Sequence, residues 1–298
     1  MSNFSEKFIE IVSERDILQA KFLRKQSLTT EEKNEFEDWL GFYQKVQGLT
    51  IEEIADAYLW LNKMVLEETK YFYRYGSYRY SSIAEVEELV YANRDFMSKY
   101  MIGLSCSDYL WYPHLETVRY FKEKILHDER TGGIYLEVGP GGGQYLTKAI
   151  ESGKFSTYRA VDLSPASVEL SNSILKYNGL DRLCVVEEKD FFELTDESKY
   201  DCLVVGEVLE HVERPKDMLN KIRNLLDVNG VAFITTVITA PTIDHIYLFE
   251  DEDSVLSMVR DVGFEILDYM CATANNVPME MAIMRKMAID IAMIVRRI

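Results

Sequence analysis

The residues with the clearest chemical potential lie in a glycine-rich stretch. Residues 134–144 read Ile-Tyr-Leu-Glu-Val-Gly-Pro-Gly-Gly-Gly-Gln, an apolar run that carries Glu137 and leads into four glycines. This order predicts a strand, a tight turn and a helix that cradle a nucleotide. Glycine is required because the backbone there takes positive φ and lies close to a ligand. A dinucleotide fingerprint from Gly139 and Gly141 needs a glycine at position 144, which is Gln. The acidic Glu137 would also lie unfavourably beside a pyrophosphate, so the stretch favours a cationic ligand.

Two further acidic residues follow segments that read as strands. Residues 157–162 form a strand-like run that ends at Asp162, about one βαβ half-unit after the glycines. An acidic residue at this point can accept hydrogen bonds from both hydroxyls of a ribose. A third apolar run, residues 183–186, leads to Asp190 and Phe191.

The order of these segments resembles that of class I S-adenosylmethionine-dependent methyltransferases. The first motif of that family is an acidic residue followed by Gly-x-Gly-x-Gly, which here is Glu137, Gly139, Gly141 and Gly143. Residues 207–212, Glu-Val-Leu-Glu-His-Val, resemble the segment after strand 4 in the ubiquinone-biosynthesis O-methyltransferase group. The resemblance covers residues 133–264 and does not extend to the first 110 residues.

The resemblance implies that the chain binds S-adenosylmethionine and releases S-adenosylhomocysteine. It implies that Asp162 binds the ribose, that Asp190 reaches the adenine amino group and that Phe191 packs on the adenine ring. The expected cofactor-binding residues are Glu137, Gly139, Gly141, Gly143, Asp162, Asp190, Phe191 and Gly206. Methyl transfer from a sulfonium is an in-line displacement, so the protein mainly positions and desolvates the reactants and needs no covalent nucleophile.

A mixed set of carboxylates and histidines follows the fourth strand-like run. Glu207, Glu210 and His211 are spaced i, i+3, i+4 and lie together if the segment is helical. His245 follows the next strand, at the same carboxyl edge of the sheet. In one interpretation, His211 or His245 is a general base for an acceptor hydroxyl, with Glu207 beside it.

Two other interpretations of this set stay open. The four side chains could bind a divalent metal that lowers the pKa of the acceptor, for which the ligand types suit magnesium, manganese or zinc. This arrangement resembles the small-RNA 2′-O-methyltransferases, which use a Glu-x-x-Glu-His motif and a later histidine. Alternatively, the side chains are structural and hold the loop and the methionyl end of the cofactor.

Strand-like and helix-like segments alternate from residue 133 onward. The alternation predicts an α/β fold, a doubly wound and mostly parallel sheet with helices on both faces. Residues 231–237 and 265–271 are expected strands. The family has seven strands, and by its pattern residues 289–295 form an antiparallel strand 7 beside strand 5. A helix over residues 114–126 is expected to lie against the sheet.

The chain before residue 111 predicts a separate, all-helical layer. Residues 1–110 show helical periodicity with few strand signals, and Thr50 to Glu53 fit a capping box. We expect a helical extension or lid over residues 1–110 and the methyltransferase domain over residues 111–298. The aromatic run of residues 71–80 is either an interface with that domain or a lid that faces the acceptor.

Composition limits the class of partner. The formal net charge of −17 argues against nucleic acid, which binds to basic surfaces. The sequence shows no signal peptide and no membrane span, so a cytoplasmic protein without a membrane partner is expected. A homodimer through the helical extension is conceivable. The cysteines share no metal-ligand spacing and are expected to be reduced; they are Cys106, Cys184, Cys202 and Cys271.

These observations favour an enzyme that methylates an oxygen or nitrogen of a small-molecule metabolite, and a biosynthetic intermediate is the expected acceptor. A metal-assisted RNA methyltransferase or a protein methyltransferase is the first alternative, supported by the Glu and His set and opposed by the negative charge. A non-catalytic module that retains the cofactor fold is the second, and the intact Glu137, Asp162 and glycines argue against it. The sequence does not identify the acceptor.

Overall fold

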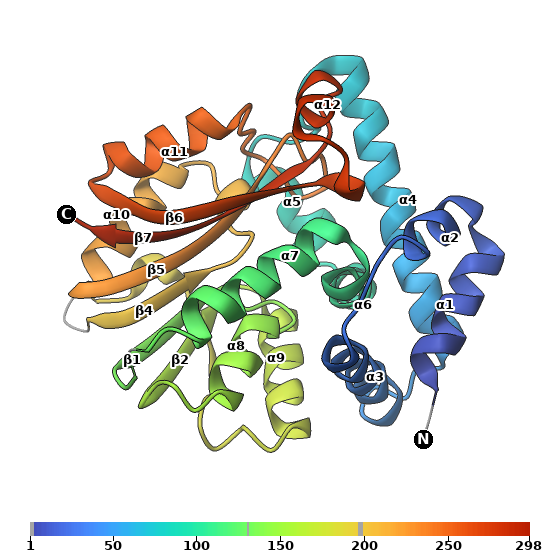
Figure 1. The fold of residues 1–298 in the computed structure, drawn as a ribbon, viewed down its shortest axis with the longest axis horizontal. Helices are drawn as coiled ribbons and strands as arrows, with labels where there is room; N and C mark the ends of the chain where they lie inside the picture. The colour runs from blue at the N-terminus through green and yellow to red at the C-terminus, as the bar shows by residue number, and fades with distance from the viewer. Residues whose placement is uncertain (1–2, 130, 196–198) are drawn as a thin grey trace.

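The computed structural model describes residues 3–129, 131–195 and 199–298 and is built on a seven-stranded sheet (Figure 1). The strand order is β3-β2-β1-β4-β5-β7-β6. Neighbouring strands are parallel from β3 to β5, and β7 is antiparallel to both β5 and β6. The strands are β1 (Ile134–Val138), β2 (Thr157–Asp162), β3 (Val186–Glu188), β4 (Tyr200–Val205), β5 (Leu226–Ile238), β6 (Phe264–Thr273) and β7 (Ile289–Arg297). The predicted mostly parallel sheet with an antiparallel seventh strand is confirmed.

Helices cover both faces of the sheet (Figure 1). One face packs on α7 (Tyr112–Phe121), α8 (Gln144–Glu151) and α9 (Pro165–Tyr177), and the other on α10 (Pro215–Leu225) and α11 (Glu252–Asp261). The central strands are buried on both sides: in β4, Leu203 joins the α10 and α11 core while Val204 joins the α7 and α8 core. This double burial explains why the central parallel strands read as continuous apolar runs.

Three expected boundaries differ in the structure. The strand predicted at residues 183–186 begins only at Val186, because Leu183 and Val185 point to solvent while the Asn172 side chain bonds the backbone N–H and C=O of Val186. The fifth strand starts five residues earlier than the predicted 231–237. The added residues include Asn229 and Gly230, a pair that favours a turn in the sequence. The predicted helix 114–126 is α7 followed by a π-helical turn, η2 (Lys122–Leu126).

The N-terminal part is all-helical, as predicted. Its helices are α1 (Phe4–Arg15), α2 (Ile17–Leu23), α3 (Thr30–Lys45), α4 (Ile51–Tyr75), α5 (Ile83–Val86), the π-turn η1 (Glu87–Tyr91) and α6 (Arg94–Leu110). Thr50 and Glu53 form the predicted capping box at the start of α4. These helices build a core of their own, which also takes in Ile174 of α9, and a second cluster that includes Ile246. The division of the chain at residues 110 and 111 remains a prediction.

Short helical elements connect the strands on the carboxyl side of the sheet. They are η3 (Phe191–Glu193), η4 (Leu209–His211), η5 (Ala274–Asn276) and α12 (Met279–Met284). All four cysteines are free, as expected. Among the described residues, no helix combines the length and the apolar character that a membrane crossing requires.

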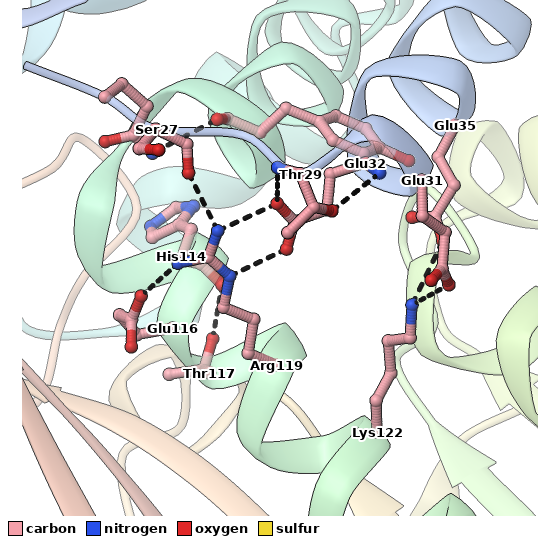
Figure 2. Close-up of polar contacts among 12 residues, drawn as sticks. Ser27, Thr29, Glu31, Glu32, Glu35, His114, Glu116, Thr117, Arg119 and Lys122 are labelled. Carbon is pink, nitrogen blue, oxygen red and sulfur yellow. Dashed lines mark hydrogen bonds and ion pairs between the residues drawn. The ribbon is translucent and has the colours of Figure 1, made fainter.

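An ionic clasp fixes α7 to the N-terminal helices (Figure 2). The Arg119 guanidinium donates from Nε and Nη2 to the two carboxylate oxygens of Glu32, at 2.7 and 2.8 Å, and also to Ser27 and Glu116. Glu32 is only 8% exposed and also accepts the Thr29 N–H in the capping box of α3. One turn on, Lys122 pairs with acidic residues of α3. The clasp orients α7 and therefore the side chains that α7 presents at its first turn.

We predict that Arg119→Met destabilises the chain more than the loss of an exposed ion pair. Removal of the guanidinium leaves the buried Glu32 carboxylate without its partner, which should lower the free energy of unfolding by about 1.5–3 kcal/mol. The matched control is Lys70→Met, which breaks the exposed pair with Glu67 and should cost roughly 0.5 kcal/mol or less. Urea unfolding measures both, and equal destabilisation would contradict the structural role of the clasp.

Candidate active site

A cavity of about 1750 Å³ lies at the carboxyl edge of the sheet. Its walls come from the loops after β1, β2, β4 and β5 and from helices α4, α6 and α7. The N-terminal helices thus line the same space as the glycine loop. Pockets for one small ligand occupy about 300–1,000 Å³, so this cavity has room for two molecules side by side. Of the predicted site residues, all line the cavity except Gly143 and Glu210.

Glu137 is the next-to-last residue of β1 and is buried. Its carboxylate accepts a 2.5 Å hydrogen bond from the Tyr135 hydroxyl, and it is only 2% exposed. Burial raises the pKa of Glu137 to about 8, although the hydrogen bonds from Tyr135 and the Leu146 N–H act in the opposite direction. A cationic ligand beside Glu137 would favour its ionised form.

The glycine loop has the backbone conformation that the sequence predicts. Gly139, Gly141 and Gly143 all have positive φ, between 53° and 74°. At Gly139 a Cβ would also stand 2.9 Å from the Val208 side chain, so a larger residue would clash as well as strain. Gly143 is the N-cap of α8 and so contributes to the turn rather than to the cavity surface.

Asp162 stands at the end of β2 and faces the glycine loop. Its Oδ1 accepts the Ser164 N–H at 2.8 Å and its Oδ2 accepts the Gly141 N–H at 3.3 Å. Burial raises the pKa of Asp162 to about 6, against these backbone hydrogen bonds. The position suits the predicted ribose contact, since the side chain is held on the cavity wall at the carboxyl edge of the sheet.

The remaining predicted cofactor residues also line the cavity. Asp190 caps η3 through a 2.8 Å hydrogen bond from the Phe192 N–H. Phe191 is 6% exposed and belongs to the core beneath the sheet. Gly206 lies so close to Tyr145 that a Cβ at this position would come within 2.7 Å of the Tyr145 ring. Contacts of these residues with the cofactor remain predictions.

Glu207 adopts a strained backbone at the edge of the cavity. Its φ is +53°, a region that non-glycine residues rarely occupy outside sites with a function. Thr235 of β5 holds this conformation: its carbonyl and hydroxyl accept the Glu207 N–H, and its hydroxyl donates to Glu207 Oε1 at 2.6 Å. Burial raises the pKa of Glu207, although the Thr235 hydrogen bond opposes it.

The structure brings His211 and His245 together with Glu210. The two imidazole rings are 4.8 Å apart in an edge-to-face contact. His211 Nδ1 lies 3.0 Å from the Asp244 carbonyl and His245 Nδ1 lies 2.6 Å from the Ala240 carbonyl. A carbonyl oxygen only accepts, so Nδ1 carries the proton in both rings and Nε2 carries the lone pair. Both rings are therefore set to accept a proton or to bind a cation through Nε2.

The carboxyl group of Glu210 lies beside this pair of histidines. Glu210 is fully buried, its Oε2 accepts from the Thr236 hydroxyl at 2.7 Å, and its backbone carbonyl accepts the Ile246 and Tyr247 N–H groups. Its Oε1 has no hydrogen-bond partner among the described residues and lies 3.9 Å from His211 Nε2. Burial raises the pKa of Glu210 well above its ordinary value, and the neighbouring charge of Glu207 adds to the shift.

These three residues form the donor set that could hold a divalent cation. One donor atom from each of Glu210, His211 and His245 lies within 4.8 Å of the others. Ligands about 2.1 Å from one tetrahedral cation stand roughly 3.4 Å apart, so the set would need to close around an ion. Glu207, the fourth predicted candidate, is engaged with Thr235 and is not part of the set.

Three functional candidates were missed in the sequence. Asp108, His114 and Asp290 line the same cavity. His114 and Asp108 lie in the helical region, where no motif marks them. Asp290 gave a signal that was not used: it is the one charged residue in the apolar run of residues 289–295. A charge at a buried strand position breaks the local pattern and indicates a functional site.

The aromatic run of residues 71–80 is mainly an interface. The Tyr78 hydroxyl accepts the Ala240 N–H at 3.1 Å, and its ring packs edge-on against His245. Tyr73 donates to the Arg285 carbonyl and also lines the cavity. The N-terminal layer therefore supports the loop that carries His245.

Comparison with known proteins agrees with this site. Residues 136–232 match the family described as a methyltransferase domain. The chain is 28% identical over 119 residues to a ubiquinone biosynthesis O-methyltransferase of Glaesserella parasuis, covering 37% of this chain and 49% of the relative. It is 24% identical over 136 residues to EEF1A lysine methyltransferase 2 of Mus musculus, covering 43% and 55%. The chain thus spans about half the length of the curated relatives it matches.

A solved structure with a similar fold is that of the mitomycin 7-O-methyltransferase MmcR. It superposes with a TM-score of 0.55 over 83% of this chain and 70% of its own length, at 13% identity. At this identity the likeness concerns the fold alone. The sheet order, the glycine loop after β1 and the acidic residue after β2 define a class I methyltransferase fold. Residues 136–232 match the methyltransferase-domain family, and the fold around them agrees with that match.

We predict that Asp162→Asn weakens S-adenosylmethionine binding by about 1–3 kcal/mol, because the amide no longer accepts from both ribose hydroxyls. Burial holds the pKa of Asp162 at about 6, and the ionised form is the better acceptor. Affinity of the unmodified chain should therefore rise between about pH 5 and pH 7, and this part of the pH dependence should vanish in the variant. Calorimetry measures both, with the exposed Glu250→Gln as control. Unchanged affinity in Asp162→Asn would refute the ribose assignment.

Proposed function

We propose that the protein transfers a methyl group from S-adenosylmethionine to an oxygen or nitrogen of a small-molecule acceptor. The observation that carries this proposal is the single cavity that joins the glycine loop and Asp162 to the Glu207, His211 and His245 wall. A donor at the first end and an acceptor at the second would meet inside a partly desolvated space. In-line methyl transfer needs this positioning more than it needs any protein nucleophile.

The size and charge of the molecule support a small acceptor. Residues of α4 and α6 line the cavity and His245 is buried beside it, which favours an acceptor small enough to enter the cavity. The net charge of −17 also opposes RNA as the acceptor. The match to the lysine methyltransferase covers only 43% of this chain, so it does not indicate that this chain methylates a protein.

His211 is the general base in this proposal. His211 lines the cavity, and burial lowers the pKa of His245 to about 3, so that His245 stays neutral. A proton taken up at His211 Nε2 would be stabilised by Glu210 Oε1 at 3.9 Å and by Asp244 Oδ2, which is 3.5 Å from Nδ1. Burial acts to raise the pKa of Asp244, but His211 and the hydrogen bonds from Thr242 and Tyr100 outweigh it, so the pKa is lowered and the side chain is an anion.

The direct test is methyl transfer from labelled S-adenosylmethionine to a fractionated cell extract. We expect label in the low-molecular-weight fraction and none in the RNA or protein fractions. Label that enters only RNA or protein would overturn the small-molecule acceptor, and failure of the chain to bind S-adenosylmethionine would overturn the whole assignment.

We predict that His211→Asn lowers kcat by about 10²–10⁴-fold, the usual contribution of a general base, and leaves cofactor affinity nearly unchanged. The matched control is His127→Asn, because His127 is exposed and lies outside the cavity lining. Steady-state kinetics with the labelled acceptor fraction and cofactor calorimetry measure the two effects. Equal turnover in both variants would contradict the assignment of His211 as a base and favour a structural role for it.

A chelator separates the base from the metal interpretation. The unpartnered Glu210 Oε1 and the two Nε2 lone pairs favour a divalent cation as the second candidate role of this set. The donor atoms must close to hold an ion, so we expect turnover to be unchanged by EDTA and by added Mg²⁺, Mn²⁺ or Zn²⁺. Turnover that is lost with EDTA and restored by one of these ions would assign the set as a metal centre.

A further inference from the structure

Two carboxyl groups from distant parts of the chain flank His114, and a third lines the same cavity and acts on both of them. Asp108 comes from α6, Glu207 from the loop after β4, and Asp290 from β7; we call them the acidic wall. Asp108 Oδ1 lies 3.8 Å from His114 Nδ1, and Asp290 Oδ2 lies 3.8 Å from His114 Nε2. The charge of Glu207 contributes to the raised pKa of Asp108 and to that of Asp290, after burial in each case. All four side chains line the cavity.

Asp290 lacks the partner that a buried carboxyl group needs. It is 3% exposed, and its Oδ2 has no hydrogen-bond partner among the residues that the structure describes. A buried carboxyl oxygen without a partner destabilises the folded state unless a ligand satisfies it. Buried polar groups in native proteins are nearly always satisfied, so this atom points to a missing group.

His114 does not provide the missing positive charge. The Ser107 hydroxyl donates to the Leu104 carbonyl at 2.7 Å, so His114 Nδ1 must donate to Ser107, 3.0 Å away. Nε2 therefore carries a lone pair and faces Asp290. Burial lowers the pKa of His114 to about 4, which keeps the ring neutral near pH 7.

No free basic residue of the described chain offsets the wall either. Lys148 acts on Asp108 from a distance, but its ammonium is paired with Glu35. Burial raises the pKa of Asp108 to about 7 and that of Asp290 well above its ordinary value. The wall thus holds several acidic groups that become anions readily only when a cation arrives.

We propose that the acceptor is a small-molecule amine, which the acidic wall binds as its ammonium ion and which is methylated on nitrogen. This inference rests on the proposed function and specifies its acceptor. A hydroxyl acceptor brings no positive charge and would leave the wall without a partner. An ammonium ion has three donors and can satisfy more than one carboxylate at once.

The chemistry balances without a further reactant. The bound ammonium loses one proton to His211 Nε2 and becomes a neutral amine with a lone pair. That lone pair forms the N–C bond while the S–C bond of the cofactor breaks and its electrons go to sulfur. The positive charge therefore moves from sulfur to nitrogen, toward the carboxylates, which stabilise the transition state. The product is a methylated ammonium ion and S-adenosylhomocysteine.

Matched probe pairs test the inference on the full chain loaded with S-adenosylhomocysteine. The pairs are phenethylamine with 2-phenylethanol, and hexylamine with 1-hexanol, which differ mainly in the charged group. We expect each amine to bind at least about tenfold more tightly than its alcohol by calorimetry. No preference in either pair, including no binding of any probe, would overturn the inference.

Two variants locate the preference on the wall. Asp290→Asn and Glu207→Gln should each reduce the preference for the amine about tenfold and leave alcohol binding unchanged. Glu250→Gln is the exposed control. S-adenosylhomocysteine affinity within about twofold of the unmodified chain shows that a variant is folded. A preference that survives in both folded variants would overturn the inference, whereas loss of S-adenosylhomocysteine binding by the unmodified chain would defeat the proposed function instead.

Discussion

Burial of carboxyl groups at one edge of a sheet is the constraint on which the rest of the site depends. Glu137, Asp162, Glu207 and Asp290 follow or belong to four different strands, and each is largely removed from water. Low-dielectric surroundings make several like charges costly, so such groups stay protonated or find a cation. A sulfonium donor offers positive charge at the glycine-loop end. The acceptor end poses the same requirement, and the amine inference answers it.

The sheet and its cofactor edge could be predicted because their signals are local. Positive φ at Gly139, Gly141 and Gly143 follows from the residue types alone, and Asp162 follows from its place after an apolar run. Strand β7 could be placed through the resemblance to a known family. The third strand begins later than predicted. The Asn172 side chain that bonds the backbone of Val186 lies fourteen residues before it, so the pattern of neighbouring residues does not reveal where the strand begins.

The acceptor end could not be predicted because it is assembled from distant segments. His114 meets Asp290 only because α7 packs on the sheet, where Phe121 contacts Phe233 of β5. Glu210, His211 and His245 were recognised as a set, but their tautomers follow from backbone carbonyls that no motif records. The lone aspartate in an apolar strand was the one readable sign of the acidic wall.

Different parts of the sequence line the donor end and the acceptor end of the cavity. The residues expected to bind the donor all lie after residue 133, whereas α4, α6 and α7 line much of the rest of the cavity. Substitutions in the helical layer can therefore alter which molecule is accepted without disturbing the glycine loop. During evolution, substitutions in the first hundred residues could change the acceptor while the residues expected to bind the donor stay the same.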